Sequence, residues 1–106
     1  MGIYHLDRIF QAGSVAVVGA SEKPDSIGTA IMENLINAGF EGAIYPVHPH
    51  YSQISNRQAY RSVTKLPAPP DLIIIATPIR TVPGIIKECA EIDAGGAVIV
   101  SVGGKE

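Results

Sequence analysis

Three groups of residues in the sequence have the types and spacing to contact a ligand. The first is the loop from Gly19 to Gly28, which joins an apolar run to a segment with helical spacing. The others are His48-Pro49-His50 and Thr77-Pro78, each of which follows another apolar run. Ligands of parallel α/β sheets bind at the carboxyl ends of the strands, so we expect the three groups to meet at one edge of a sheet.

The Gly19–Gly28 loop has the composition of a phosphate-binding turn. Gly19 and Ala20 are small enough for the backbone to turn sharply or to approach a ligand closely. Ser26 stands at the N-cap position of the next helix, whose free N–H groups and positive dipole end favour a phosphate. The fingerprint G-x-G-x-x-G is absent, so an ordinary strand-to-helix connection without a ligand remains the alternative.

The two histidines after the second apolar run bear on two other kinds of site. An NAD-binding domain needs Asp or Glu there to bind the ribose hydroxyls, and Val47 to His50 offer no carboxylate, so NAD is disfavoured. The spacing of His48 and His50 could suit a metal, but no third ligand with a suitable pattern follows. We therefore predict no metal, and interpret this segment as an exposed loop or a phosphate contact.

Composition restricts the class of protein. The 106 residues predict one domain, 1–106, with 46% hydrophobic and 17% charged residues, as in a globular protein. A net charge of −2 gives no support for nucleic-acid binding, and no apolar run approaches the length of a membrane span. No signal peptide is recognisable, and the single cysteine, Cys89, fits a reducing compartment. We expect a cytoplasmic protein without nucleic-acid or membrane partners, with Cys89 in the core rather than in catalysis.

The alternation of strand and helix patterns predicts an α/β fold, a Rossmann-like doubly wound parallel sheet of about five strands. Its expected order is 58–60, 43–47, 15–18, 71–76 and 97–102, with helices over 27–38 and 82–92 and a helical turn over 6–10. Thr81 is expected to cap the second helix. Because no helix follows 97–102 to cover the sheet, we expect a chain truncated after the last strand, the N-terminal fragment of a longer protein.

Several ordered motifs together resemble the CoA-binding domain of NDP-forming (ADP-forming) acyl-CoA synthetases, which is also similar to the succinyl-CoA ligase α-subunit. The same module opens protein lysine acetyltransferases. The motifs are Ser14-Val-Ala-Val-Val-Gly-Ala-Ser21, Ser26-Ile-Gly28, Tyr45-Pro-Val-His-Pro49, Asp71-Leu-Ile-Ile-Ile-Ala-Thr-Pro78 and Val100-Ser-Val-Gly103.

The resemblance implies that coenzyme A lies along the carboxyl edge of the sheet. The implied phosphate contacts come from the loop and the start of the helix: Gly19, Ala20, Ser21, Lys23, Ser26, Ile27 and Gly28. The implied contacts at the nucleotide end are Pro49, His50, Thr77 and Pro78. The family usually has Asn-Pro-Lys where this chain has His48-Pro49-His50, and Ser-Ala-Gly-Phe where it has Ser101-Val-Gly-Gly104. An imidazolium at His50 would replace the lysine charge only at low pH.

The resemblance also implies that this module binds CoA or acyl-CoA and does not catalyse alone, because the phosphorylated histidine of the synthetases belongs to a later domain. Three hypotheses follow: the CoA-binding module of a synthetase such as an acetate–CoA ligase, the N-terminal part of a lysine acetyltransferase, or a stand-alone binding or sensor protein. The expected partners are downstream ligase or acetyltransferase domains, and a homo-oligomer is left open. If Gly19 approaches a phosphate, Gly19→Val should abolish CoA binding without much loss of fold.

Overall fold

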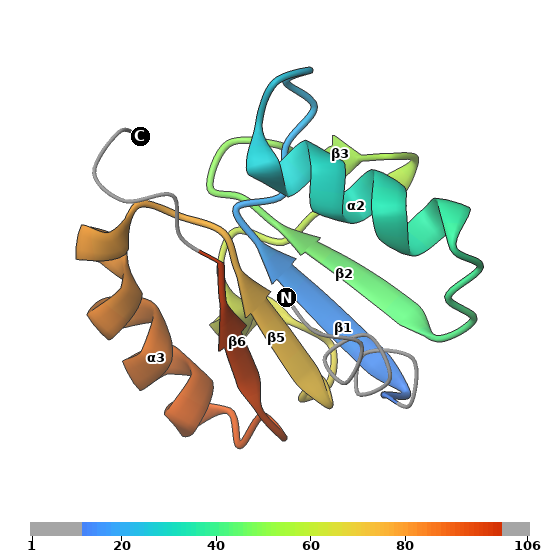
Figure 1. The fold of residues 1–106 in the computed structure, drawn as a ribbon. Helices are drawn as coiled ribbons and strands as arrows, with labels where there is room; N and C mark the ends of the chain where they lie inside the picture. Colours follow the sequence, from blue (N-terminus) through green and yellow to red (C-terminus); the bar gives the residue numbers. More distant parts are fainter. Residues whose placement is uncertain (1–11, 101–106) are drawn as a thin grey trace.

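A four-stranded parallel sheet with one helix against each face forms the centre of the molecule (Figure 1). The computed structural model describes residues 12–100, so the turn expected over 6–10 and the chain beyond Val100 lie outside the described residues. The elements of this layer are β1 (Ser14–Val18), α2 (Ile27–Asn37), β2 (Ala43–Val47), β5 (Leu72–Ile75), α3 (Val82–Glu91) and β6 (Ala97–Ile99).

The strand order is β2-β1-β5-β6, with every neighbouring pair parallel. The chain first winds from β1 through α2 to β2, then crosses to the other side of β1 to form β5 and β6. The switch point therefore lies between β1 and β5, in agreement with the expected order of these strands. Backbone bonds beyond the strands keep the carboxyl ends together, since Gly19 N–H donates to Val47 O (2.9 Å) and Ala76 N–H to Val18 O (2.8 Å).

The segment around Gln58 is not a fifth strand of this sheet. It belongs to a small antiparallel hairpin of β3 (Gln53–Ile54) and β4 (Arg57–Gln58), whose two turn residues both have positive φ, as a type I′ turn requires. Tyr60, just after the hairpin, pairs with the main sheet through one parallel bridge to Val47. The expected edge strand fails because the chain leaves the sheet edge again directly after this bridge.

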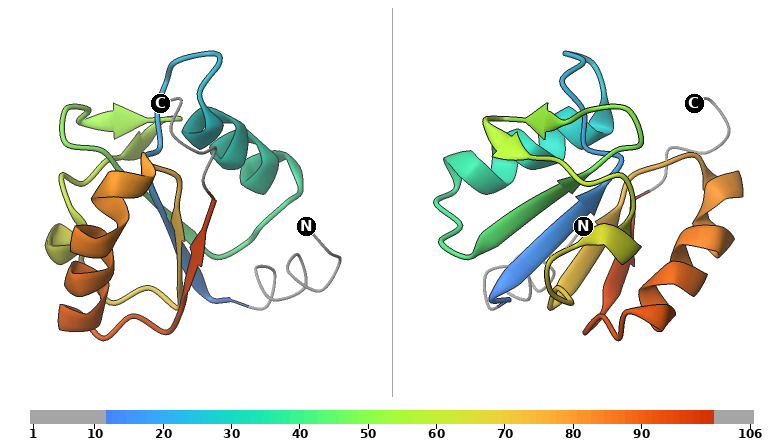
Figure 2. Two further views of the ribbon diagram at one scale, coloured as in Figure 1. Left: turned by 60° about the vertical axis from the view of Figure 1, so that its left-hand side comes forward. Right: turned by 180° about the vertical axis from the view of Figure 1, so that it is seen from behind.

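Both central strands are buried on both sides, which explains their unbroken apolar sequences. Val15 and Val17 face α2, while Ala16 and Val18 face α3, and β5 alternates in the same way. Figure 2 (left) shows the sheet close to edge-on, with α2 and α3 on opposite sides. The hairpin adds Ile54 to the α2 side, and the short helix η1 (Val63–Lys65) adds Val63 to the α3 side.

Helix α3 forms over nearly the expected range, but it differs in two respects from an amphipathic helix capped by Thr81. Val82 and Cys89 are buried, but Ile86 is 38% exposed although its spacing places it on the inward side. Thr81 does occupy the N-cap position, at the end of the short helix η2 (Ile79–Thr81), but its side chain makes no capping bond. The Thr81 hydroxyl is instead hydrogen-bonded to Thr77 and Pro78 in the preceding turn.

Candidate functional site

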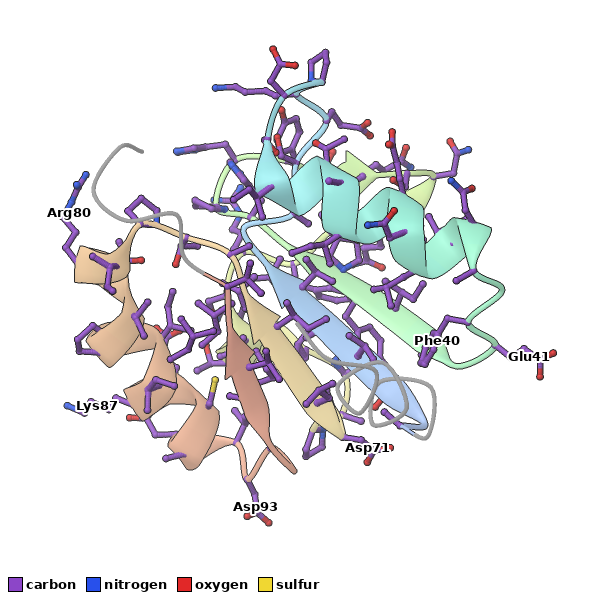
Figure 3. The ribbon with its side chains drawn as sticks, viewed as in Figure 1. Phe40, Glu41, Asp71, Arg80, Lys87 and Asp93 are labelled. Atoms are coloured by element: carbon purple, nitrogen blue, oxygen red, sulfur yellow. The ribbon has the colours of Figure 1, made fainter. Side chains whose placement is uncertain are left out.

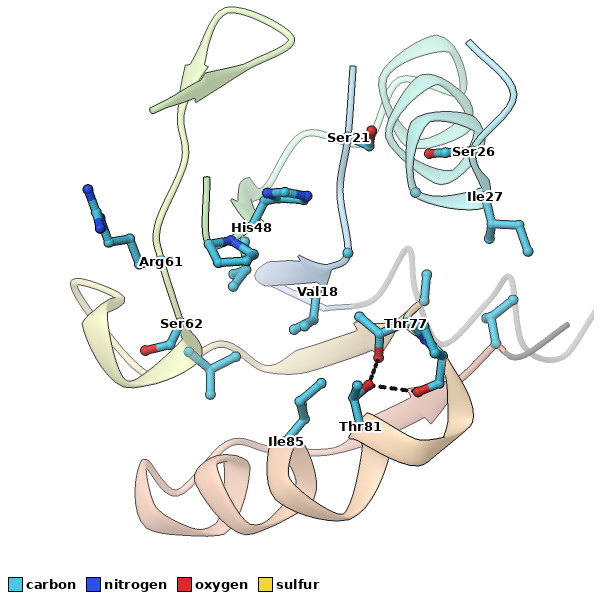
Figure 4. A pocket seen from close by; sticks show the side chains of 18 of the residues that line it. Val18, Ser21, Ser26, Ile27, His48, Arg61, Ser62, Thr77, Thr81 and Ile85 are labelled. Atoms are coloured by element: carbon cyan, nitrogen blue, oxygen red, sulfur yellow. Dashed lines mark hydrogen bonds between the residues drawn. The ribbon is translucent and has the colours of Figure 1, made fainter. Parts of the chain in front are cut away.

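A cavity of about 600 Å³ opens at the carboxyl edge of the sheet, at the switch point (Figure 4). Its walls come from the loop after β1, the start of α2, the end of β2, the segment before η1, the turn after β5 and one side of α3. The lining residues are Val18, Gly19, Ser21, Lys23, Ser26, Ile27, Gly28, Val47, His48, Pro49, Arg61, Ser62, Val63, Ala76, Thr77, Pro78, Thr81, Ile85, Glu88 and Val100.

The structure brings together nine of the residues expected at the site: Gly19, Ser21, Lys23, Ser26, Ile27, Gly28, Pro49, Thr77 and Pro78. Ala20 is fully buried and packs into the core under α2, so its side chain supports the loop from below. His50 is exposed and does not line the cavity, because the chain bends at Pro49 and His50 after leaving β2. His48 lines the cavity in its place.

Short hydrogen bonds hold the loop after β1 and present the start of α2 to the cavity. Ser26 Oγ accepts from Thr29 N–H (3.1 Å), as the sequence predicts for an N-cap. Thr29 Oγ1 in turn donates to Ser21 O (2.8 Å), and Ser21 Oγ accepts from Lys23 N–H (3.0 Å). The first turn of α2 contains no acidic residue, so its positive end is left for an anion.

The two glycines of the loop are required by close backbone contact. Gly19 has φ +95°, and a Cβ there would lie 2.5 Å from Ala76 O. A Cβ on Gly28 would overlap Gly19 O, so only glycine lets α2 begin directly against the end of β1. This close approach of helix and strand is one role of glycine in dinucleotide-binding folds, although the spacing here differs. The structure therefore argues against the expectation that Gly19→Val leaves the fold intact.

The turn after β5 forms the opposite lip of the cavity. The Thr81 hydroxyl is hydrogen-bonded to Thr77 Oγ1 and to Pro78 O, each at 2.7 Å (Figure 4). These bonds fix the turn from β5 into α3 and keep Thr77 and Pro78 against the loop that carries Gly19. Hydroxyl groups and apolar side chains thus form this side of the cavity.

The ring of His48, which lines the cavity, is oriented by two contacts. Its Nδ1 accepts from His50 N–H (3.0 Å), and its ring meets the Tyr51 ring edge-on at 4.6 Å. Burial, and to a lesser degree the neighbouring His50 and Lys23, lower the pKa of His48 from its usual value of 6.5. The neutral imidazole therefore predominates at pH 7.

The charged residues that line the cavity are two cations, Lys23 and Arg61, and one acid, Glu88. Neither cation forms an ion pair with another residue in the range 12–100, so the cavity carries an excess of positive charge. Arg80, at the end of the turn after β5, is exposed and points away from the molecule, as does Lys87 (Figure 3). The arginine that lines the cavity is Arg61, not Arg80.

Two features of the described residues concern other kinds of site. In the chain from 12 to 100, no three His, Cys, Asp or Glu side chains are grouped as a metal would require. The helices within the same range are too short or too polar to cross a membrane.

The segment Arg61-Ser62-Val63 is one part of the cavity wall that could not be predicted from the sequence. Its position depends on the bridge between Tyr60 and Val47, in which His48 N–H donates to Tyr60 O and Tyr60 N–H to Pro46 O, each at 2.9 Å. A single bridge leaves no periodic signal in the sequence. Ile85 and Glu88 were missed for a simpler reason, because a helical stripe cannot show which of its residues will border a cavity.

A parallel sheet with a cationic cavity at its switch point, floored by a glycine turn and a helix start, defines a nucleotide-binding module of the Rossmann-like class. The sequence profile of the CoA binding domain family matches residues 13–103. The chain belongs to this family of CoA-binding domains.

Named relatives agree with this assignment. The chain is 43% identical over 101 residues to acetate–CoA ligase [ADP-forming] I of Archaeoglobus fulgidus, covering 95% of this chain and 14% of that protein. The dinucleotide-forming acetyl-coenzyme A synthetase 1 of Ca. Korarchaeum cryptofilum, solved with phosphate and ADP, superposes with a TM-score of 0.84 at 35% identity. That match covers 90% of this chain and 20% of the solved chain. The chain thus spans about one seventh to one fifth of these enzymes.

A shorter relative has nearly the size of this domain. A conserved hypothetical protein of Pyrococcus furiosus is 32% identical with a TM-score of 0.76, and the match covers 82% of this chain and 73% of that one. The same fold therefore occurs both within large ligases and in a much smaller protein.

Proposed function

We propose that the cavity at the switch point binds CoA or acyl-CoA, with its phosphates on the loop after β1 and the start of α2. The observation that carries this proposal is the convergence of nine predicted contact residues on one cavity of about 600 Å³ in a CoA-binding family domain. The N–H groups at the start of α2, together with Lys23 and Arg61, which form no ion pair with any of residues 12–100, supply donors and positive charge for phosphate oxygens.

The same site disfavours NAD. A ribose hydroxyl pair is usually bound by a carboxylate at the end of the second strand, where this chain has His48 and Pro49. Glu88, the one carboxylate among the described residues of the cavity wall, comes from α3 on another side. The cavity therefore lacks the group that orients the NAD ribose.

Titration calorimetry of the chain with CoA, acetyl-CoA and NAD tests this proposal. We expect both CoA compounds to bind more tightly than NAD. Loss of binding in Lys23→Gln, with Lys87→Gln as an exposed control outside the cavity, would place the ligand at this site. Tighter binding of NAD, or equal CoA affinity in the Lys23 variant, would contradict it.

For the complete protein, we propose an NDP-forming acyl-CoA synthetase, such as an acetate–CoA ligase [ADP-forming], in which residues 1–106 are the CoA-binding domain and work in the cytoplasm. The identity of 43% to one such ligase supports this proposal. A stand-alone CoA-binding protein is the second candidate, supported by the short Pyrococcus furiosus relative. An acetyltransferase is the third hypothesis. Sequencing the gene beyond the codon for Glu106 distinguishes ligase domains, an acetyltransferase domain and an early stop.

A further inference from the structure

We propose that His48 is a neutral hydrogen-bond donor to an oxygen atom of bound CoA, held in its Nε2–H form by the backbone of His50. The inference rests on the proposed function, because it names a residue that determines how the same cavity recognises its ligand. The family resemblance placed a contact at His50, with a charge only at low pH, whereas the geometry points to His48 as an uncharged donor.

The backbone bond determines where the His48 proton lies. A backbone N–H can only donate, so the Nδ1 atom that receives the His50 N–H at 3.0 Å must present its lone pair. The proton of the neutral ring is then on Nε2. In a charged ring Nδ1 would also carry a hydrogen. That hydrogen would face the N–H of His50, and this hydrogen bond would be lost.

The surroundings also disfavour the charged ring. Burial lowers the pKa of His48, and His50 on the same turn and Lys23 on the loop after β1 lower it further. Arg61 borders the cavity from the segment after β4, and Glu88 borders it from α3. The charged residues that line the cavity thus include a single acid, Glu88.

Packing fixes the position of the His48 ring, and with it the Nε2–H group. Tyr51 holds one side of the ring at 4.6 Å between ring centres, and the His48 backbone N–H is bonded to Tyr60 O at 2.9 Å. Nε2 is the one polar ring atom for which the described residues provide no partner. The phosphate, hydroxyl and carbonyl oxygens of CoA are the acceptors that such a donor can use.

Three variants of the chain separate a ligand contact from a role in the turn. His48→Asn keeps an acceptor near the Nδ1 position for His50 N–H but does not reach as far as Nε2. His48→Ala removes both. His50→Ala is the matched control, since its backbone N–H is retained and its side chain lies outside the cavity.

CoA affinity is measured by calorimetry at pH 7.5 for the wild type and the three variants. We expect His48→Asn and His48→Ala to bind CoA about three- to ten-fold more weakly, as for the loss of one hydrogen bond, and His50→Ala to bind like the wild type. Wild-type affinity in His48→Asn would reduce His48 to a turn residue and overturn the inference. A wild type that binds no CoA would instead refute the proposed function.

A spectroscopic test reports the proton itself. Long-range ¹H–¹⁵N correlation spectra distinguish the two neutral forms of the ring and its charged form, and the two alanine variants assign the signals of His48 and His50. We expect His48 to show the neutral Nε2–H pattern at pH 7.5, both free and with CoA bound. A proton on Nδ1 in the CoA complex, whether in a neutral or a charged ring, would overturn the inference.

Discussion

Replacement of Gly19 by alanine tests how closely the loop after β1 approaches the end of β5. Gly19 has φ +95°, and its Cβ would lie 2.5 Å from the carbonyl oxygen of Ala76 and 3.0 Å from Thr77 Cγ2. The positive φ costs an alanine about 1–2 kcal/mol. The overlap with backbone atoms adds about 1–3 kcal/mol, because a neighbouring strand end must shift. We expect Gly19→Ala to lower the free energy of unfolding by about 2–5 kcal/mol.

Two other glycines provide the controls for this measurement. Gly39 has φ +80° and no atom within 4 Å of the position that a Cβ would take, so Gly39→Ala reports the conformational cost alone, about 1–2 kcal/mol. Gly84 lies in α3 with open space around it, and Gly84→Ala should be neutral or stabilise the domain by up to about 1 kcal/mol.

Urea unfolding followed by far-ultraviolet dichroism measures all three variants. With an m value of about 2 kcal/mol/M, the midpoint of Gly19→Ala should fall by about 1–2.5 M, and that of Gly39→Ala by less than about 1 M. If Gly19→Ala and Gly39→Ala lose the same stability, the close contact between Gly19 and Ala76 does not exist. The same result would remove the packing argument for glycine at the cavity floor.

Three further changes test other parts of the site. Ser26→Ala removes the N-cap of α2 and should cost about 1 kcal/mol of unfolding free energy, whereas Ser26→Asp should retain it, as measured by urea unfolding. Glu22→Ala breaks the bond from Ser55 N–H to Glu22 Oε2 (2.9 Å), so hydrogen exchange of the hairpin turn should speed up while Glu22→Gln keeps most of its protection. Burial lowers the pKa of His48, so the unfolded chain binds a proton more readily than the folded one, and stability is lost as the pH falls below the unfolded value of about 6.5. We therefore expect a lower urea concentration at the unfolding midpoint at about pH 5.5 than at about pH 7.5. The difference should be smaller in His48→Asn, which cannot take up this proton.

The sheet could be predicted from sequence because its signals are local and redundant. The short, β-branched apolar runs of β1 and β5 are typical of strands buried on both sides, and alternation with helices makes a parallel sheet the simplest arrangement. The Ser26 cap identified the start of α2 to the residue. The three loops of the site then follow from topology alone, because parallel strands end at the same edge.

The hairpin and the wall that follows it could not be predicted in this way. The turn at Ser55-Asn56 has φ values of 53° and 63° without a glycine, so the strongest hairpin signal is missing. The strands it joins have two residues each, too few for a period of two to be seen. Arg61, which the hairpin delivers to the cavity, was therefore not recognised as a site residue.

The exchange of roles between His48 and His50 shows why spacing alone misplaces a side chain at a strand end. In an extended chain, residues i and i+2 point to the same side, so both histidines should have faced the ligand. The chain instead bends at Pro49 and His50, and the His50 N–H turns back onto the His48 ring. One histidine therefore enters the cavity while the other supplies only its backbone. The positive charge of the site then comes from Lys23 and Arg61, on two different segments, and His48 contributes direction rather than charge.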